Sequence, residues 1–351
     1  MVKNIFYISF TRLEYSLNAV CIKGLEQNGI TVYGRRLCKR QWKEYFHAWQ
    51  EYRRIRKNVD LIIAGYDSPG LAILARLFSR KRVVYNAVLS IYERMIVSRA
   101  MAARFSIKSF YYWLSDFLAV HLSHLIMLES NSQISYFHQI FGVSKNKCFR
   151  AWIGADEDRF FYDPNIAKPT IFTVVFRGGL LPEAGAEYIV KAAKLLENEN
   201  LKITMHANDQ ELPKIKKMIE DLKPKNLQLI TEFLSDEDLR ILMQKSHLSL
   251  GQLSAHPRLQ RTIPHKCYES LAMKLPYLTA ANPGILELLT PEQTCLICDP
   301  ANAQSLAEKI LWAKNNYPFV EKIAENGYEL YQNKLRSMVL AKKLLDRVSL
   351  S

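Results

Sequence analysis

Short apolar segments alternate with longer amphipathic segments along the whole chain, and this alternation constrains the fold more than any other feature. The short segments, such as residues 4–9, 60–64 and 172–176, have the length and the Val, Ile and Phe content of buried strands. The longer segments, such as residues 16–28 and 186–198, have the spacing of helices that bury one face. Because parallel strands are joined by crossover helices, the sequence predicts an α/β fold with helices on both faces of its sheets.

The alternation is interrupted once, between residues 158 and 170, where two proline-containing turns break any regular element. A second series of strand and helix segments begins at Phe172. A chain of 351 residues is also long enough for two domains. We therefore predict two doubly wound, Rossmann-like domains, residues 1–162 and 163–351, with the option that the last helix packs back on the first domain.

Basic residues are concentrated in the first half of the chain. The whole chain holds 48 Lys and Arg against 34 Asp and Glu, a formal net charge of +14. Residues 1–160 hold 24 of the basic and 12 of the acidic residues, a net charge of +12. The first domain is therefore expected to meet an anionic partner, which could be a phosphorylated substrate, an acidic membrane surface or nucleic acid.

The cysteines and the apolar segments indicate the cellular compartment in which the protein works. Cys295 and Cys298 form a C-x-x-C pair, but no second Cys or His pair with the spacing of a zinc site accompanies it. No stretch reaches the roughly 18 uncharged apolar residues of a membrane-spanning helix, and the apolar run near Met1 is too short for a signal peptide. We therefore expect a cytoplasmic protein with buried thiols, peripheral at the inner face of the cell membrane.

A segment rich in both basic and aromatic residues spans residues 35–57. Three interpretations of it stay open: core packing, an interfacial helix on anionic lipid, and binding of single-stranded nucleic acid. Further basic clusters in residues 76–82 and 92–112 favour a membrane surface and argue against nucleic acid as the partner. The side chains with helical spacing in the first segment are Trp42, Tyr45, Phe46, Trp49 and Arg53.

The first segment with a chemical signature is residues 172–185, where an apolar strand runs into Arg177, Gly178 and Gly179 before a helix. Backbone N–H groups at such a turn and at the helix start could bind a phosphate group, and Arg177 could add positive charge. A purely structural turn is the alternative, since two glycines between a strand and a helix need no ligand.

The second such segment is residues 261–276, in which Pro264 begins a predicted helix and Lys266 and Glu269 follow within its first turns. A lysine at the positive end of a helix is locally unfavourable, and an anionic ligand there would offset the cost. Glu269, one turn further along, could accept hydrogen bonds from sugar hydroxyls. A surface ion pair between the two side chains is the alternative interpretation.

In their order along the chain, these segments resemble the nucleotide-sugar domain of GT-B glycosyltransferases, most closely those of glycosyltransferase family 4. The helix with Lys266 and Glu269, followed by Pro276 and by residues 284–287, is the most specific part of the likeness. The likeness extends over most of the chain, to residues 25–32, 141–143, 153–160, 231–239 and 299–307.

The resemblance implies a metal-independent hexosyltransferase of polysaccharide biosynthesis, with a nucleotide diphosphate sugar as donor and no cofactor. The second domain would hold the donor, and the first would hold a lipid-linked or glycan acceptor. Transfer would occur across the cleft between the two domains, with retention of the anomeric configuration. Lys266 would pair with the diphosphate, Glu269 with the ribose, and the glycine pair would let the phosphates approach. The backbone at Phe233 and Leu234 would flank the base.

The chain departs from the family at several positions. Arg261 stands where the first Glu of the family's Glu-x7-Glu pair is common, and Asn86 stands where a His often follows the fourth strand. We take Arg261 and Arg177 as replacements for the family's usual phosphate-binding charges, and Asn86 as a catalytic candidate beside Lys266 and Glu269. Three alternatives stay open: a nucleotide-sugar epimerase of the same fold, a non-catalytic GT-B-like subunit, and a nucleic-acid-binding protein.

Overall fold

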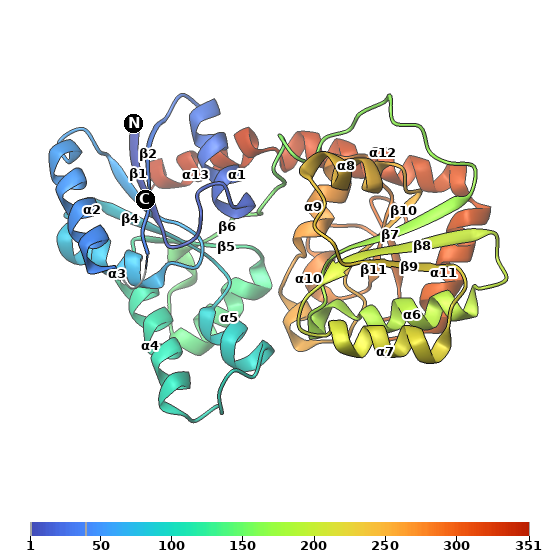
Figure 1. Cartoon of the computed structure of the whole chain (residues 1–351). Helices are drawn as coiled ribbons and strands as arrows, with labels where there is room; N and C mark the ends of the chain where they lie inside the picture. Colours follow the sequence, from blue (N-terminus) through green and yellow to red (C-terminus); the bar gives the residue numbers. More distant parts are fainter. Residues whose placement is uncertain (1, 39–40, 351) are drawn as a thin grey trace. The chain divides into compact units, whose positions relative to one another are not determined.

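The computed structural model describes residues 2–38 and 41–350, and in it the chain divides into two compact units (Figure 1). The first unit contains Met1–Asp156 together with Leu335–Ser351, and the second contains Glu157–Lys334. The end of the chain therefore returns to the first unit.

The division between the units lies after Asp156, whereas the sequence placed it after residue 162. The reason is the packing of Phe160, which is buried in a cluster with Val175 and Met243 of the second unit. The irregular segment before β7 therefore contributes to the core of the second unit.

The first unit is built on a sheet of six parallel strands in the order β2-β1-β3-β4-β5-β6. This is the order of a doubly wound fold, in which strands are added first on one side of β1 and then on the other. Because all pairs are parallel, the carboxyl ends of the strands lie at one edge of the sheet. The strands are β1 (Asn4–Ser9), β2 (Thr31–Arg36), β3 (Leu61–Ala64), β4 (Arg82–Val88), β5 (Leu125–Leu128) and β6 (Cys148–Arg150).

Helices cover both faces of this sheet, because successive side chains of a strand point to opposite faces. In β1, Phe6 and Ile8 pack against α2, α3, α4 and α5 on one face, and Ile5 and Tyr7 pack against α1 and α13 on the other. The helices of the first unit are α1 (Ser16–Gln27), α2 (Trp42–Ile55), α3 (Pro69–Phe78), η1 (Glu93–Ser98), α4 (Ile107–Leu122), α5 (Asn131–Phe141), η2 (Lys145–Lys147) and α13 (Ser337–Leu350).

The second unit repeats this plan with a sheet of six parallel strands in the order β12-β11-β10-β7-β8-β9. Figure 1 shows this sheet between two layers of helices. The strands are β7 (Phe172–Gly179), β8 (Leu201–Asn208), β9 (Leu227–Ile230), β10 (Leu248–Leu250), β11 (Tyr277–Ala280) and β12 (Leu296–Cys298).

The two faces of the second sheet have separate cores. Val174 and Phe176 pack on one face with α6, α7 and α11, and Val175 packs on the other with α8. The helices are η3 (Pro182–Ala184), α6 (Ala186–Leu195), α7 (Leu212–Leu222), α8 (Asp236–Gln244), η4 (Pro257–Gln260), α9 (His265–Ala272), α10 (Pro283–Leu286), α11 (Ala303–Asn315) and α12 (Tyr317–Lys334).

The predicted α/β fold class is confirmed by these two parallel sheets. The strand predicted at 4–9 agrees with the structure residue for residue, and the one predicted at 60–64 begins one residue later, at Leu61. The strand predicted at 172–176 continues to Gly179, because Gly178 and Gly179 still pair with β8. Within residues 2–38 and 41–350, no helix is long and apolar enough to cross a membrane.

The aromatic face of α2 is only partly used for core packing. Tyr45 and Tyr52 pack against the core of the first unit, whereas Trp42 and Phe46 expose 72% and 47% of their surface. Core packing alone therefore does not account for this face. Lys39 and Arg40, which precede the helix in the basic segment, lie outside the described residues.

A close approach of two helices at Gly24 fixes α13 on the first unit. A Cβ atom on Gly24 would lie 2.1 Å from the carbonyl oxygen of Ser337 and 2.9 Å from Cβ of Ala341. Both of these residues belong to α13. Only glycine therefore allows α13 to pack this closely on α1.

We expect Gly24→Ala to lower the free energy of unfolding of the first unit by about 1–3 kcal/mol, because the added methyl group must displace α13. Urea denaturation followed by circular dichroism measures the loss. Gly70→Ala in α3 is the matched control, since a Cβ atom there would meet only ring atoms of Phe10 at 3.6 and 3.8 Å. Equal effects of the two substitutions would contradict the packing of α13 on α1.

Candidate functional site

The glycine pair at the end of β7 makes room for two charged side chains. Gly178 has a φ angle of 142°, which residues with a Cβ atom rarely adopt. A Cβ atom at Gly178 would lie 3.1 Å from Nζ of Lys266, and one at Gly179 would lie 2.9 Å from Oδ2 of Asp209. Both contacts lie at the carboxyl edge of the second sheet.

Lys266 lies in the first turn of α9, and its side chain is buried. Its Nζ atom has no hydrogen-bond partner within the described part of the chain and lies 3.7 Å from the centre of the Phe176 ring. Burial lowers the pKa of Lys266 to about 7, and the charge of Arg177 acts in the same direction. A buried ammonium without a hydrogen-bond acceptor is costly, so an anionic ligand beside Lys266 would stabilise the protein.

Glu269 lies one turn further along α9 and is 1% exposed. A guanidinium nitrogen of Arg177 donates to both of its carboxylate oxygens, at 2.8 and 2.6 Å, and Nδ1 of His265 lies 3.3 Å from Oε1. Burial alone would raise the pKa of Glu269, but the charge of Arg177 and the contact with His265 hold it at about 2. The carboxylate is therefore ionised at neutral pH.

The interpretation of Lys266 and Glu269 as a surface ion pair is wrong, because both side chains are buried. The charged partner of Glu269 is Arg177, which reaches it from β7. Contacts join Arg177, Gly178, Lys266 and Glu269 into one cluster, which we call the Lys266 cluster.

Hydrogen bonds between neighbouring loops hold the same edge of the sheet together. Glu183 forms an ion pair with Arg258, and its backbone oxygen accepts a hydrogen bond from the Ser254 hydroxyl at 2.9 Å. The side-chain amide of Asn282 donates to the backbone oxygen of Ser254 at 3.1 Å. The loops that follow β7, β10 and β11 are thereby fixed to one another around the start of α9.

The other predicted donor-binding residues lie in loops at this edge. Phe233 and Leu234 connect β9 to α8, and the Phe233 side chain is 92% exposed whereas Leu234 packs against a buried cluster. Arg261 follows η4 and precedes α9, and it is partly exposed. The structure thus places all of these predicted residues in one unit, with Phe233 free of core packing.

Asn86, the catalytic candidate of the first unit, lies near the end of β4 and is 5% exposed. Its side chain interacts with the hydroxyl group of Tyr7, whose pKa is raised by burial. Asn86 also lines a cavity of about 600 Å³ within the first unit, together with residues of α1 and α13 such as Leu17 and Leu344. Its catalytic role stays a prediction.

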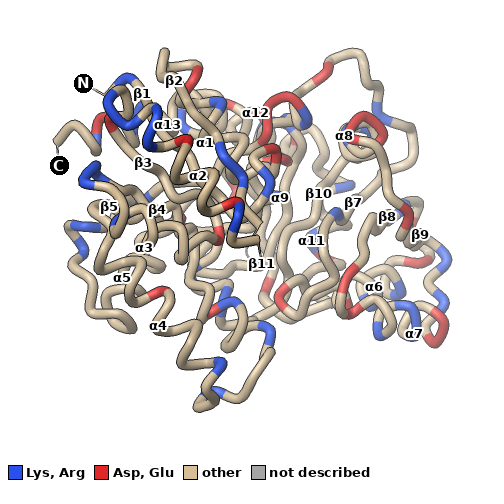
Figure 2. Tube along the Cα trace, turned by 60° about the vertical axis from the view of Figure 1, so that its left-hand side comes forward, with Lys and Arg blue, Asp and Glu red and all other residues tan. Residues whose placement is uncertain are grey.

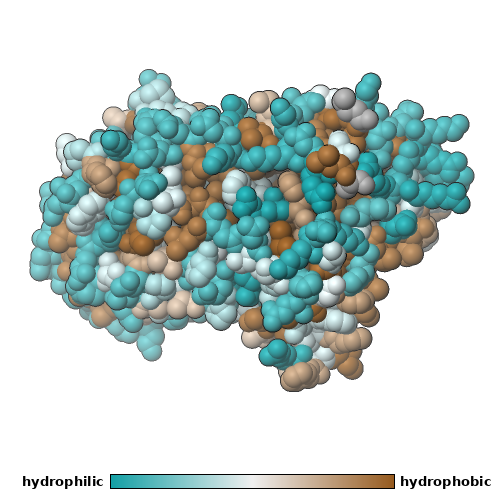
Figure 3. Space-filling model, turned by 180° about the vertical axis from the view of Figure 1, so that it is seen from behind, coloured by the Kyte–Doolittle hydropathy of each residue, from teal (hydrophilic) through white to brown (hydrophobic). Residues whose placement is uncertain are grey.

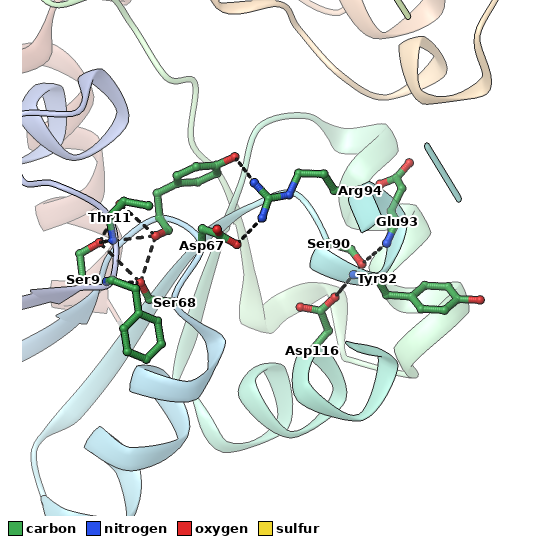
Figure 4. A network of polar contacts seen from close by, with 11 residues as sticks. Ser9, Thr11, Asp67, Ser68, Ser90, Tyr92, Glu93, Arg94 and Asp116 are labelled. Atoms are coloured by element: carbon green, nitrogen blue, oxygen red, sulfur yellow. Dashed lines mark hydrogen bonds and ion pairs between the residues drawn. The ribbon is translucent and has the colours of Figure 1, made fainter. Parts of the chain in front are cut away.

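A network of polar side chains lies at the carboxyl edge of the first sheet (Figure 4). Arg94 donates to the Asp67 carboxylate at 2.6 Å and to the Tyr66 hydroxyl at 3.4 Å. Ser68 accepts a hydrogen bond from the backbone N–H of Phe10 at 2.9 Å. The ends of β1 and β3 are thereby linked to the segment that follows β4.

The buried end of this network contains two carboxyl groups (Figure 4). Asp116 accepts hydrogen bonds from the Ser90 hydroxyl at 2.7 Å and from the Tyr92 N–H at 2.9 Å, and burial raises its pKa to about 7. Glu93 is 1% exposed and accepts a hydrogen bond from the Gln133 amide at 2.9 Å. These two carboxyl groups fix the segment between β4 and α4.

The sequence analysis did not identify Ser90, Asp116 or Gln133, although Asp116 and Gln133 are 1% and 0% exposed. One signal was present, since Asp116 is the only charged residue between Lys108 and His121 in an otherwise apolar helix. A lone acid in such a helix is buried only with hydrogen-bond donors around it.

Solved structures with the same arrangement of elements identify the fold of the whole chain. HepE of Anabaena in complex with UDP-glucose has a TM-score of 0.71 and 16% identity, covering 99% of this chain and 100% of that chain. Sucrose-phosphate synthase of Thermosynechococcus elongatus has a TM-score of 0.77 and 12% identity, covering 99% and 98%. A glycosyltransferase of Rickettsia africae has a TM-score of 0.67 and 16% identity, covering 98% and 97%. The whole chain has the GT-B glycosyltransferase fold.

A family match makes the assignment more specific. The model of the family described as "Glycosyl transferases group 1" matches residues 158–330, which are nearly all of the second unit. No curated protein sequence matches the chain. The second unit, with its Lys266 cluster, belongs to the group 1 glycosyl transferases, and the whole chain has the fold of GT-B glycosyltransferases.

We expect Lys266→Met to stabilise the ligand-free protein near neutral pH. The pKa of Lys266 is about 7 in the folded chain, against an ordinary value of 10.5, so the unfolded chain binds more protons between these values and folding stability rises with pH there. The full cost of the buried charge is present below pH 7. The gain from Met should be largest there and shrink by up to about 1.4 kcal/mol per pH unit toward pH 10.

Urea denaturation of both proteins between about pH 6 and pH 9 measures this difference. Lys217→Met, at an exposed lysine of α7, is the matched control and should change stability by less than about 0.5 kcal/mol at each pH. A Lys266→Met protein that is less stable than the wild type throughout this range would show that the buried ammonium has a compensating partner.

Proposed function

We propose that this chain transfers a hexose-type sugar from a nucleotide diphosphate sugar to an acceptor, with retention of the anomeric configuration. One observation carries the proposal: the buried Lys266 ammonium lacks a hydrogen-bond acceptor among the described residues and lies against Gly178. In doubly wound sheets, the carboxyl edge on which it lies is where nucleotide ligands bind. Membership of the second unit in group 1 supports the reaction class, and the resemblance to family 4 supports retention.

A diphosphate would supply the negative charge that the Lys266 cluster lacks. Lys266 would pair with it directly, and Arg261 in the preceding loop would add a second positive charge. Backbone N–H groups in the first turn of α9 would complete the site, because a helix N-terminus favours phosphate. These groups together would stabilise the diphosphate as it leaves the sugar, so the proposed reaction assigns no step to a metal or a cofactor.

Glu269 is proposed to hold the ribose of the nucleotide. An ionised carboxylate has about four acceptor positions, and Arg177 and His265 occupy only part of them. The remaining capacity could accept a hydrogen bond from a ribose hydroxyl. Arg177 is thus a positioning residue for Glu269 in this proposal, in addition to being a phosphate-binding candidate.

Uridine is the first candidate for the base. HepE of Anabaena, which shares the fold over its whole length, is described in complexes with UDP and with UDP-glucose. In this chain the exposed ring of Phe233, at the end of the loop after β9, offers an apolar surface beside which a base could lie.

We expect a uridine nucleotide to raise the melting temperature of the wild type more than GDP, CDP or dTDP, because a ligand that binds only the folded state stabilises it by mass action. At 100 times the dissociation constant the shift should be roughly 5–10 °C. Differential scanning fluorimetry measures it. Lys266→Met should lose the shift and Lys217→Met should keep it. An unchanged shift in Lys266→Met would refute the proposed role of this lysine.

The acceptor is proposed to be a lipid-linked sugar or a cell-surface glycan, bound by the first unit at an anionic membrane surface. Support comes from the segment at the start of α4, where Phe105 and Ile107 are 96% and 90% exposed. Arg104 and Lys108 flank these two residues in the sequence. Figure 3 shows hydrophobic side chains at this lower tip of the first unit, and Figure 2 shows basic residues along the same segment. Apolar side chains beside basic ones suit the interface of an anionic membrane.

We expect the wild type to sediment with liposomes that contain anionic lipid and much less with neutral liposomes. The double substitution Phe105→Glu and Ile107→Glu should abolish sedimentation, because it puts two negative charges at the most exposed apolar positions of the tip. Phe319→Glu, at a 49% exposed phenylalanine of α12, is the matched control and should sediment like the wild type. Equal, negligible sedimentation of the wild type with both kinds of liposome would remove the membrane proposal.

A further inference from the structure

An apolar groove lies on the first unit between α2 and α3. Its volume is about 690 Å³, which is within the range of sites that bury a small organic ligand. One wall is the aromatic face of α2, the other wall is α3, and the floor is formed by side chains of β1 and β3, namely Phe6, Ile8 and Ile62. The groove therefore reaches down to the sheet itself.

The lining of this groove has almost no polar groups that could form hydrogen bonds with water. Of its fifteen residues only Ser79 is neither aliphatic nor aromatic, and the Ser79 hydroxyl is hydrogen-bonded to the hydroxyl of Tyr52. An ordered water needs two to four polar partners, so water in this groove is poorly held. An apolar ligand would replace it favourably.

Aromatic side chains at the rim are left largely exposed. Trp42 and Phe46 on α2 expose 72% and 47% of their surface, and Phe78 on α3 exposes 62%. A cluster of exposed apolar side chains of this kind is typical of a binding site and is uncommon on the rest of a protein surface. The aromatic face that the sequence identified on α2 is thus a wall of the groove, and only part of it belongs to the core.

The elements around the groove are strongly basic. Residues 42–57 and 69–81 contain eight Lys and Arg and two acidic residues, Glu44 and Glu51, a net charge of +6. The Glu51 carboxylate lies 3.8 Å from the Arg35 guanidinium in an ion pair, so a residue of β2 already balances the Glu51 charge. The Arg53 guanidinium lies over the ring of Trp49, 4.8 Å from its centre, which brings a cation directly to the wall of the groove.

We propose that this groove binds the hydrocarbon chain of a membrane lipid that has a phosphate head group. The apolar lining matches the chain, and the basic surroundings match the head group. A second copy of this chain is a poorer occupant, because two equally basic rims would repel each other. That this lipid carries the acceptor sugar rests on the proposed function. Binding of the lipid in the groove does not, because it requires no nucleotide.

Tryptophan fluorescence gives a direct test, because Trp42 and Trp49 line the groove. The probe is a dodecyl phosphate with bromine at the far end of its chain, used below its micelle concentration. Bromine quenches a tryptophan that it contacts, so quenching should be saturable. A probe with a decyl chain, two methylenes shorter, should bind about 15-fold more weakly, because each methylene contributes about fourfold to affinity. The same chain on a trimethylammonium head should also bind more weakly.

Two variants, one on each wall of the groove, are tested so that misfolding of one of them cannot by itself explain a loss of binding. Phe46→Glu on α2 and Phe78→Glu on α3 change partly exposed positions and should each weaken binding at least tenfold. Leu195→Glu, at a 55% exposed leucine of α6, is the matched control and should bind like the wild type. Inorganic phosphate should produce no quenching and should not compete at equal concentration.

Several outcomes would overturn the inference. They are the absence of saturable quenching in the wild type, unchanged binding in both groove variants, and no dependence on chain length. A dimer in analytical ultracentrifugation that Phe46→Glu dissociates would assign the groove to a second copy instead. Loss of lipid binding with an intact nucleotide shift would remove this inference alone, and loss of the nucleotide shift with intact lipid binding would remove only the proposed donor.

Discussion

The cost of burying the Lys266 ammonium governs the carboxyl edge of the second unit. A buried charge is tolerated when its surroundings leave room for it and other charges are balanced nearby. Gly178 provides the room by lacking a Cβ atom, and the Phe176 ring provides a weak cation–π contact. Arg177 balances Glu269 but repels Lys266. When Lys266 is protonated, the cluster therefore holds one positive charge in excess, which suits an anionic ligand and makes the fold less stable than a neutral cluster would.

The strand-helix alternation was sufficient to predict the two parallel sheets. The ion pair between Arg177 and Glu269 could not be predicted from the sequence. The spacing of Lys266 and Glu269 fits a ligand site and a surface ion pair equally well, because both place the residues one turn apart. The deciding partner, Arg177, is 92 residues away along the chain and meets Glu269 only after β7 and α9 pack together. Helical spacing likewise placed Trp42 and Phe46 on one face of α2, but whether a neighbouring helix covers that face depends on the tertiary packing of α3.

The first unit uses the same sheet plan for a different kind of surface. Its carboxyl edge contains non-glycine residues with positive φ angles, Asp67 at 58° and Val88 at 61°. Val88 is the less tolerant of the two, because a β-branched side chain clashes with the backbone in this region. The π-helical turn η1 begins five residues after Val88, at Glu93. Backbone of this kind persists only where its surroundings hold it. Arg94 binds the Asp67 side chain, and the buried Asp116 and Glu93 carboxyl groups fix the start of the helical turn through hydrogen bonds from Tyr92 and Gln133. None of this strain is visible in the residue types alone.

The basic charge and the exposed apolar side chains of the first unit are separate properties that act over different distances. Residues 1–160 hold twice as many basic as acidic residues, so twelve basic side chains would stay without an acidic partner even if all others paired within this region. Such a surface attracts anions over about a Debye length, which salt shortens. The exposed side chains of Phe105 and Phe78 act only on contact, through burial that salt does not screen. Basic charge would thus bring the unit to an anionic surface, and the apolar groups would hold it there, so neither property alone accounts for the composition of this half of the chain.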